Sequence, residues 1–377
     1  MSVEIRKVQT KKELKDFIHF ANDLYKGDKY YAPSLISDDY NTFDPKKNGA
    51  YDFCQAQMFL AYKDGKLAGR VMAIINSRAN ESWKVKQVRY GWIDFINDEE
   101  VAKALLDAVA AWGKERGMTE IAGPLGFTDF DPEGMLVEGF DRLATLPGIY
   151  NYPYYPQILE KLGFTKETDW MEYRITIPDE LPERYYKYAD IVIAKNKLNV
   201  RKVTRRMINK ENYGRKFFKL INETYYKLYG FSLLSDKQID SYTKLYLGLL
   251  DTRMVSFIEN EKGELVAAGV TMPDISEALQ KCNGELFPFG WYHLLKAIFW
   301  KPGDTIDMLL VGVREDYRGK GLNAVLVTDL YPRLKAMGFK YAETTAELET
   351  NDKIQAMWKY FEREQHKRRR VYAKKIE

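Results

Sequence analysis

The chain opens with a short stretch of alternating apolar and polar residues, and almost the same stretch recurs roughly 200 residues later. Residues 5–8 read Ile-Arg-Lys-Val and residues 200–203 read Val-Arg-Lys-Val. Each stretch is followed by a helical pattern that ends at a glycine, Gly27 in the first half and Gly230 in the second. The pattern therefore predicts an internal repeat, with one strand and one helix at the start of each copy.

A β-hairpin is predicted next in both halves. Two apolar runs flank a glycine-containing turn in each, which is a strong hairpin signal. The strands and turns are expected at 59–62, 63–65 and 66–75, and again at 255–258, 259–263 and 264–272. The second strand of each hairpin carries a glycine at a similar place, Gly69 and Gly269.

Each half then runs from a strand into a long amphipathic helix. Both helices end at a glycine, Gly117 and Gly338, where left-handed backbone geometry favours a stop. The expected strands and helices are 90–96 and 99–116, then 306–313 and 322–337. A strand, a closing helix and a last strand complete each half, at 121–122, 155–162 and 171–177, and at 341–345, 354–364 and 369–375. The pattern predicts an α/β (α+β) protein of two lobes, each with a mixed central sheet flanked by helices.

A length of 377 residues also favours two domains over one core. We expect the first lobe at 1–178, a charged and tyrosine-rich linker at 179–198, and the second lobe at 199–377.

The first lobe contains an insertion rich in Gly, Pro and Tyr at about 123–156, which indicates an ordered but irregular loop. Four of its tyrosines form an aromatic wall in a cleft between the lobes or pack at the lobe interface: Tyr150, Tyr152, Tyr154 and Tyr155.

The strongest chemical signal is the junction of the strand 306–313 with the helix that follows it. The turn reads Arg314-Glu-Asp-Tyr-Arg-Gly-Lys-Gly321, so an apolar strand enters a loop with two glycines, and the loop opens a helix. A helix N-terminus presents unpaired N–H groups and partial positive charge, and Arg318 and Lys320 add formal charge. A pyrophosphate-binding loop explains this arrangement better than an ordinary charged turn between a strand and a helix.

The same stretch resembles the motif of the GNAT superfamily of acyl-CoA transferases. In that motif a strand ending in Val is followed by a Pro-Glu-Tyr-like turn and then by Arg-Gly-x-Gly-Ile-Gly. This chain has Val313, the turn 314–317, and Arg318-Gly319-Lys320-Gly321-Leu322-Asn323. Asn323 replaces the usual final Gly or Ala, and Pro332 lies within the following helix, where we expect a kink.

The resemblance implies a tandem, two-lobed GNAT arrangement and an acyl-CoA site in the second lobe. The backbone of Val311 and Val313 would hold the pantetheine amides. The residues expected to hold the pyrophosphate are Arg318, Gly319, Lys320, Gly321, Leu322 and Asn323.

A second part of the family pattern lies close to the C-terminus. In many GNAT proteins an Asn leads the closing helix and contacts coenzyme A, and a Tyr seven positions later protonates the departing thiolate. This chain keeps Asn351 but has Trp358 at the tyrosine position. An indole is not a useful acid. Tyr360, a water molecule or unassisted thiolate departure are the alternatives.

A general base must accept the proton of an amine near neutral pH. Glu343 on the strand 341–345 and Glu347 just after it are the candidates, because the family cleft opens where the central strands diverge. Each carboxylate, taken singly, is also explained as a solvated group near a loop.

The first half lacks the phosphate loop. The corresponding turn reads Ile96-Asn97-Asp98-Glu99-Glu100, without a glycine or a cation. Its carboxylates would cap the helix and repel an anionic ligand. We therefore predict a degenerate GNAT-like first lobe with no coenzyme site.

Charge and composition exclude several functional classes. The 58 basic and 54 acidic side chains give a net charge of only +4, so no nucleic-acid partner is expected. Two cysteines and three scattered histidines give no disulfide framework or metal site, and a cytoplasmic location is expected. The N-terminus has no signal-peptide pattern. The apolar stretch Phe289–Trp300 is too short to span a bilayer; a core or cleft-lining helix is favoured over a membrane-surface helix, and no membrane partner is expected.

The resemblance implies an enzyme, an N-acyltransferase that uses acetyl-CoA or another acyl-CoA as co-substrate without a metal. We expect direct attack by a small-molecule or peptide amine in a ternary complex, with acetyl transfer as the first expectation. A CoA-binding protein without catalysis and a Fem-like aminoacyl transferase are the alternatives. The acceptor and the oligomeric state are not determined by the sequence.

Overall fold

A computed structural model describes residues 2–146, 148–247 and 250–377, and it shows one continuous mixed sheet that runs through both halves of the chain. The strands are β1 (Val3–Lys7), β2 (Cys54–Lys63), β3 (Lys66–Asn76), β4 (Gln87–Phe95), β5 (Glu120–Gly123), β6 (Met135–Glu138), β7 (Thr165–Thr176), β8 (Asn199–Arg201), β9 (Val255–Glu259), β10 (Leu265–Pro273), β11 (Thr305–Val313), β12 (Tyr341–Thr344), β13 (Glu347–Leu348) and β14 (Arg363–Lys375). Their order across the sheet is β1-β2-β3-β4-β5-β14-β7-β12-β11-β10-β9-β8. The described strands of the two halves therefore follow one another in mirrored order.

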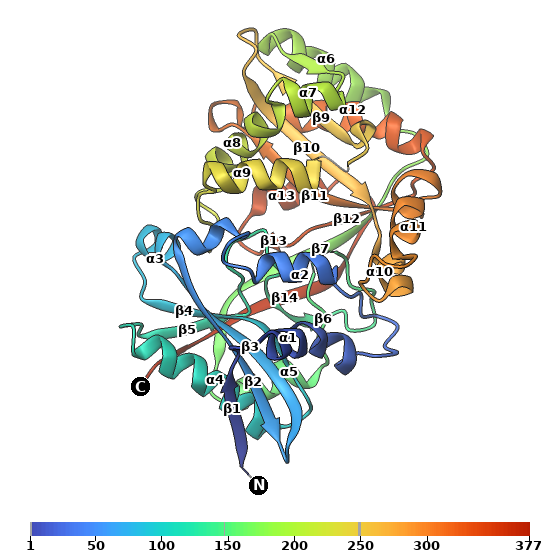
Figure 1. The fold of residues 1–377 in the computed structure, drawn as a ribbon. Coiled ribbons are helices and arrows are strands. Elements are labelled where there is room, and N and C mark those ends of the chain that lie inside the picture. The colour runs from blue at the N-terminus through green and yellow to red at the C-terminus, as the bar shows by residue number, and fades with distance from the viewer. Residues whose placement is uncertain (1, 147, 248–249) are drawn as a thin grey trace.

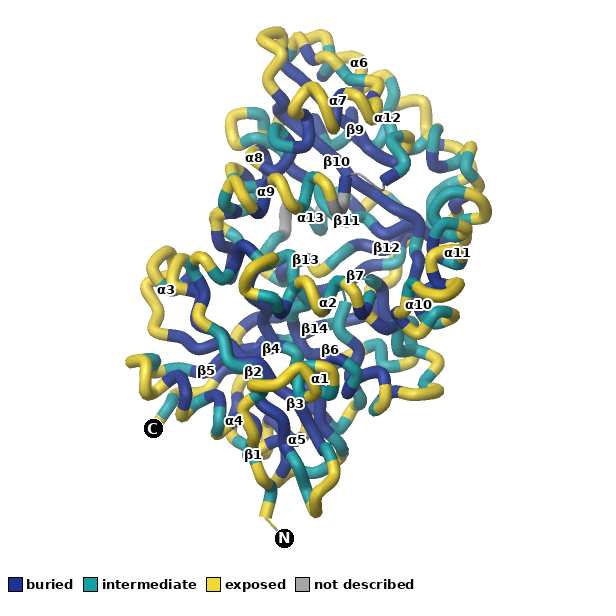
Figure 2. Tube along the Cα trace, viewed as in Figure 1, coloured by how far each residue is buried: buried dark blue, intermediate teal, exposed yellow. Residues whose placement is uncertain are grey.

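The helices cover the sheet in both halves (Figure 1). They are α1 (Lys11–Leu24), α2 (Ile36–Thr42), α3 (Ser77–Trp83), α4 (Glu99–Lys114), α5 (Tyr154–Lys161), α6 (Glu183–Asn196), α7 (Arg205–Lys210), α8 (Tyr213–Tyr225), α9 (Asp236–Tyr242), α10 (Ser276–Cys282), α11 (Gly290–Leu295), α12 (Leu322–Ala336) and α13 (Asp352–Met357). The strands are mostly buried, whereas the outer faces of the helices are exposed (Figure 2).

The internal repeat is confirmed by the packing of its two glycines. A β-carbon at Gly69 of β3 would lie 2.8 Å from the Leu105 side chain of α4. Gly269 of β10 faces the equivalent helix, because its β-carbon would contact Leu326 and Leu330 of α12. The long helix of each half thus crosses the second hairpin strand at a position without a side chain.

The last strand of each half is exchanged with the other half. β7 ends the first half in sequence but pairs with β12, where Tyr341 faces Thr176. β14 ends the second half but pairs with β5, where Tyr372 faces Gly123, so the red C-terminal strand lies among the blue and green strands in Figure 1. β7 and β14 also pair with each other in antiparallel fashion, from Arg363↔Ile175 to Ala373↔Thr165. The exchange joins the two halves through backbone hydrogen bonds.

The segment 179–198, expected as a linker, contains the helix α6. Its buried residues Ala189 and Val192 pack with Leu322, Val325 and Leu326 of α12 in one apolar cluster. The charged face of α6 remains exposed, which is why the composition of this segment resembles that of a linker.

The closing helix of the second half is shorter than expected, since α13 ends at Met357 and β14 begins at Arg363. None of the helices in the described ranges combines the length and the apolar character needed to cross a bilayer.

Candidate active site

A cavity of about 1600 Å³ lies between the two halves and is the main candidate for a functional site. Its walls come from α2 and the 123–156 insertion in the first half, and from α8, β10, β11, β12, α11 and α12 in the second half. Most of the side chains that line its second-half wall are apolar: Phe217, Phe218, Met272, Leu286, Leu294, Ile298, Met308, Leu309, Leu310 and Leu330. Sites for drug-sized ligands usually occupy roughly 300–1,000 Å³, so this cavity has room for a larger ligand or for two ligands.

The N-terminus of α12 opens onto this cavity without a cap. Gly321 precedes the helix with a φ of 88°, and no side chain bonds to the first-turn amides. Within the described ranges, the N–H groups of Gly319, Gly321, Leu322 and Asn323 have no hydrogen-bond acceptor. All four residues line the cavity. The expected pyrophosphate loop therefore has free donors that converge at a helix N-terminus.

The equivalent helix of the first half is capped by its own chain. Asp98 precedes α4 and accepts hydrogen bonds from the backbone N–H groups of Glu100 and Val101. Lys63 forms ion pairs with both Asp98 and Glu100. The prediction of a self-capped helix in the first half is confirmed, because the Asp98 carboxylate occupies the place of an anion at this helix N-terminus.

The two cations of the loop lie where the motif places them. The Arg318 guanidinium donates to the carbonyl of Val313 at 3.2 Å and to that of Thr224 at 2.8 Å. Lys320 is exposed, its ammonium lies 4.8 Å from the centre of the Tyr317 ring, and its charge helps to lower the pKa of Asp316. Arg318 therefore also holds the loop against α8, whereas Lys320 contributes charge alone.

The central strands β11 and β12 separate at the cavity. They pair in parallel from Thr305↔Tyr341 to Met308↔Thr344, and Leu309, Leu310 and Val311 then line the cavity. The hydroxyl of Tyr225 lies against this edge, accepting from Val311 N at 3.3 Å and donating to Val311 O at 3.0 Å. A pantetheine amide that bonds to Val311, as the resemblance implies, would take the place of this hydroxyl or share it.

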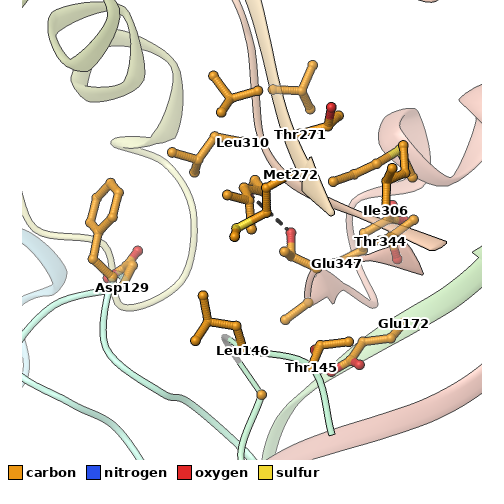
Figure 3. A pocket seen from close by; sticks show the side chains of 18 of the residues that line it. Asp129, Thr145, Leu146, Glu172, Thr271, Met272, Ile306, Leu310, Thr344 and Glu347 are labelled. Carbon is orange, nitrogen blue, oxygen red and sulfur yellow. Dashed lines mark hydrogen bonds between the residues drawn. The ribbon is translucent and has the colours of Figure 1, made fainter. Parts of the chain in front are cut away.

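Of the two candidate bases, Glu347 is the one that faces the cavity. Its Oε1 accepts a 2.8 Å hydrogen bond from Trp358 Nε1, and its Oε2 has no partner within the described ranges. Burial raises the pKa of Glu347 to about 7, although the Trp358 bond lowers it in part. Figure 3 shows Glu347 at the centre of the site, between Met272 on one side and Thr145 and Leu146 of the insertion on the other.

Glu343 lies below the cavity and does not line it. Its Oε2 accepts a hydrogen bond from Lys367 at 3.1 Å, and Arg174 approaches its Oε1 at 3.4 Å. Burial lowers the pKa of the neighbouring His366 to about 3, so this imidazole is neutral. Glu343 therefore belongs to a buried ionic cluster that joins β12 to the exchanged strands β7 and β14.

The last two predicted site residues lie apart from each other. Asn351 lines the cavity at the start of α13, as the family pattern implies. Tyr360 lies outside the cavity lining, with 74% of its surface exposed. In the described structure, the tyrosine hydroxyl at the divergence of the strands belongs to Tyr225 instead, and burial raises its pKa to about 12, so it stays protonated at neutral pH.

The insertion supplies a group of carboxylates that the sequence analysis did not single out. Asp129, Asp131 and Glu133 all line the cavity. Burial raises the pKa of Asp131 to about 6 and also raises the pKa values of Asp129 and Glu133. Asp129 Oδ1 and Glu133 Oε1 have no hydrogen-bond partner in the described chain. Partly desolvated carboxylates with free oxygens suit a cationic ligand such as an ammonium group.

Two of the four insertion tyrosines line the cavity, and the other two pack in the core of the first half rather than at an interface between lobes. Tyr150 and Tyr155 line the cavity, so the aromatic wall exists. Tyr152 and Tyr154 are not part of the lining, and they pack in the first-half core, with ring centroids 5.0 Å from Tyr25 and 5.9 Å from Phe95.

The chain matches no family model. It is 28% identical over 380 residues to Protein YghO of Escherichia coli (strain K12), across 99% of this chain and 95% of the relative. It is 25% identical over 377 residues to the bacterial ceramide synthase of Caulobacter vibrioides (strain NA1000 / CB15N), across 98% of this chain and 96% of the relative.

Two solved structures have the same fold over nearly their whole length. A tandem GNAT protein from the clavulanic acid biosynthesis pathway gives a TM-score of 0.55 at 11% identity, covering 100% of this chain and 99% of that chain. A GCN5-related N-acetyltransferase from Sphaerobacter thermophilus gives 0.51 at 12% identity, covering 99% and 96%. The chain therefore has a tandem GNAT fold, and the resemblance of its phosphate-loop motif is matched by the structure as a whole.

Proposed function

We propose that this protein is an acyl-CoA-dependent N-acyltransferase that joins a long-chain acyl group to the amine of a long-chain amino alcohol. The observation that carries the proposal is the cavity itself. It extends from the uncapped N-terminus of α12, past the diverging strands β11 and β12, to Glu347 and the carboxylates of the insertion.

The coenzyme end of the cavity is supported by the loop before α12. Free amides at Gly321, Leu322 and Asn323 suit the pyrophosphate, and Lys320 adds positive charge without an ion pair in the described chain. The contrast with Asp98 in the first half supports one coenzyme site per chain, in the second half.

The acyl chain is proposed to be long because of the size and lining of the cavity. An acetyl group would fill a small part of about 1600 Å³ and would leave the leucine and methionine walls in contact with water. Burying an apolar chain against such walls stabilises the complex by about 0.8 kcal/mol per methylene group. Acetyl transfer, the first expectation from the sequence, uses none of this surface.

The acceptor is proposed from the carboxylates and from one relative. An amine that enters as an ammonium would be held by Asp129 and Glu133, which line the cavity and each have one buried oxygen without a hydrogen-bond partner in the described chain. The relative from Caulobacter vibrioides is named a ceramide synthase, and ceramide is the amide of a fatty acid and a long-chain amino alcohol. A lipid acceptor of this kind also accounts for the apolar walls.

In the proposed reaction the bound ammonium first gives one proton to the Asp129 and Glu133 carboxylates that hold it. The neutral amine nitrogen then attacks the thioester carbonyl, and the C–S bond breaks. Glu347 accepts the proton of the attacking nitrogen, for which a pKa of about 7 is well suited. The Tyr225 hydroxyl lies at the diverging strands and is protonated, so it can supply a proton to the leaving thiolate. Trp358, which replaces the family tyrosine, instead holds Glu347 in place.

The proposal is tested by assaying the purified protein with acyl-CoA esters from acetyl to stearoyl and with sphinganine as the acceptor. Thiol release and the amide product are followed together, by a chromogenic thiol reagent and by mass spectrometry. We expect kcat/KM to rise with acyl length and the amide to form in equal amount to the free thiol. A preference for acetyl-CoA would overturn the proposed chain length, and tight CoA binding without any amide would favour the non-catalytic alternative.

A further inference from the structure

The surface around α11 exposes several large aromatic side chains. Phe287 and Phe289 precede the helix and are 78% and 71% exposed, and Trp300, at the end of the following π-helical turn (Lys296–Trp300), is 61% exposed. Trp291 and Tyr292 on the helix are also exposed. A soluble surface seldom gathers this much exposed aromatic area without a partner.

The opposite side of the same segment forms part of the cavity wall. Leu286, Leu294, Leu295 and Ile298 line the cavity, and Trp291 both lines it and reaches the surface. One short segment therefore separates the apolar cavity from the exposed aromatic surface.

The two charged side chains within this segment are both lysines, and one exposed carboxylate lies just outside each end, Glu285 and Asp304. Residues 286–303 contain Lys296 and Lys301 and no Asp or Glu. Both lysines are exposed, and neither forms an ion pair with a described carboxylate. Exposed aromatic side chains with two lysines among them match the interface of an anionic bilayer, where Trp and Tyr lie at the level of the head groups.

We infer that residues 286–303 dock this protein on the surface of an anionic phospholipid membrane. The docked face would place the cavity wall next to the bilayer, so that a lipid acceptor reaches the cavity without crossing water. Only this last step rests on the proposed function, because membrane binding itself depends on the surface alone.

The inference is tested by co-sedimentation of the full chain with vesicles of phosphatidylcholine, with and without phosphatidylglycerol. We expect binding to the anionic vesicles that weakens as salt rises. The double substitution Phe289→Ser/Trp300→Ser and the double substitution Lys296→Glu/Lys301→Glu should each weaken the partitioning roughly tenfold or more.

The matched control is Ile191→Ser/Leu233→Ser, which removes two exposed apolar side chains, 62% and 53% exposed, outside this segment. This variant should bind vesicles like the unmodified protein. Equal loss in the control, or no vesicle binding by the unmodified protein, would overturn the inference. Concentration-dependent dimerisation that only Phe289→Ser/Trp300→Ser abolishes, without vesicle binding, would show a protein interface and would also overturn it.

A soluble assay separates this inference from the proposed function. Turnover of a short-chain, water-soluble amino alcohol needs the site but not the membrane, so Phe289→Ser/Trp300→Ser should retain it while losing activity on acceptor embedded in vesicles. Vesicle binding without turnover on either acceptor would sustain the docking surface and reject the enzyme. Turnover on both acceptors without vesicle binding would sustain the enzyme and reject the docking surface.

Discussion

The indole nitrogen of Trp358 lies 2.8 Å from Oε1 of Glu347 and donates a hydrogen bond to it, across the turn between β13 and α13. The residue that occupies the expected general-acid position thus orients the expected general base. Since Glu347 lines the cavity and its second oxygen is buried without a described partner, this pair is the first target for substitution.

We predict that Glu347→Gln lowers kcat roughly 10²- to 10⁴-fold, because the amide cannot accept the proton of the attacking nitrogen. In the unmodified protein the rate should rise with pH through a midpoint near 7, since the carboxylate must be ionised and its pKa is about 7. Steady-state rates from pH 5 to 9 provide the measurement. Glu362→Gln, an exposed carboxylate before β14, is the control; a similar loss in that variant would exclude a special role for Glu347.

Trp358→Phe should move the acid limb of this profile to higher pH. The hydrogen bond from the indole stabilises the carboxylate, so its loss raises the pKa of Glu347. A bond worth about 1 kcal/mol corresponds to a shift of roughly half a unit to one unit. A lower kcat with an unshifted midpoint would instead indicate that Trp358 only fills space.

Lys320→Glu should weaken CoA binding without affecting the fold. The side chain is exposed and has no described ion pair, so its charge acts mainly on the ligand. We expect Kd for CoA to rise roughly three- to tenfold at low salt in calorimetric titrations. Lys66→Glu, at the hairpin turn of the first half, makes the same charge change away from the cavity, and an equal effect there would argue against the loop.

The double substitution Asp129→Asn/Glu133→Gln should raise KM for the amine and leave KM for acyl-CoA almost unchanged. Charge-assisted hydrogen bonds contribute about 1.5–3 kcal/mol, so we expect a rise of at least roughly tenfold. Both KM values are obtained from initial rates with each substrate varied in turn. A rise in KM for acyl-CoA alone would show that the amine does not bind at Asp129 and Glu133.

Asp307→Asn should stabilise the protein at alkaline pH. Neither oxygen of Asp307 has a described hydrogen-bond partner, and burial together with Asp274 and Glu343 raises its pKa well above the ordinary value. A raised pKa means that the folded state binds a proton more tightly, so stability is lost as pH rises above the unfolded-state pKa. The amide in the Asp307→Asn variant does not ionise, so this loss of stability at higher pH is absent.

Calorimetry should therefore give a Tm about 2–6 °C above that of the unmodified protein at pH 8, and a smaller difference at pH 4.5. Asp64→Asn, in the exposed turn before β3, should change Tm at neither pH. If the difference in Tm between Asp307→Asn and the unmodified protein were the same at both pH values, the assignment of a neutral carboxyl to Asp307 would be wrong.

Much of the fold could be predicted from the sequence because hydrophobic periodicity and turn glycines report local structure. The hairpins, the helices α4 and α12 and the loop before Gly321 lie where the pattern places them. The exchange of β7 and β14 could not be predicted, since the two strands are equivalent in the repeat and either pairing buries similar surface. Pairing partners far apart in sequence leave no local signal.

Of the cavity lining, the sequence indicated the glycine loop before α12, Asn351 and Glu347, but not Tyr225 or the acidic side chains of the insertion. The Arg318 to Asn323 loop has a local signature, whereas Tyr225 reaches Val311 from a helix 86 residues away in sequence. Asp129 and Glu133 lie in the expected cleft insertion, but their spacing resembles that of any acidic loop. Burial raises the pKa values of these carboxyl groups, and burial depends on the complete fold.

The exchange of the last strands also determines when the chain can finish folding during synthesis. The open edge of β5 meets its partner only when residues 372–375 have left the ribosome, although β5 itself ends at Gly123. The edge of β5 therefore stays unpaired until almost the entire chain has been synthesised. An unpaired strand edge is prone to aggregation, so a chaperone would be expected to shield it. Cutting the gene at its midpoint would separate β7 from β12 and β14 from β5, and would leave an unpaired strand edge in each half.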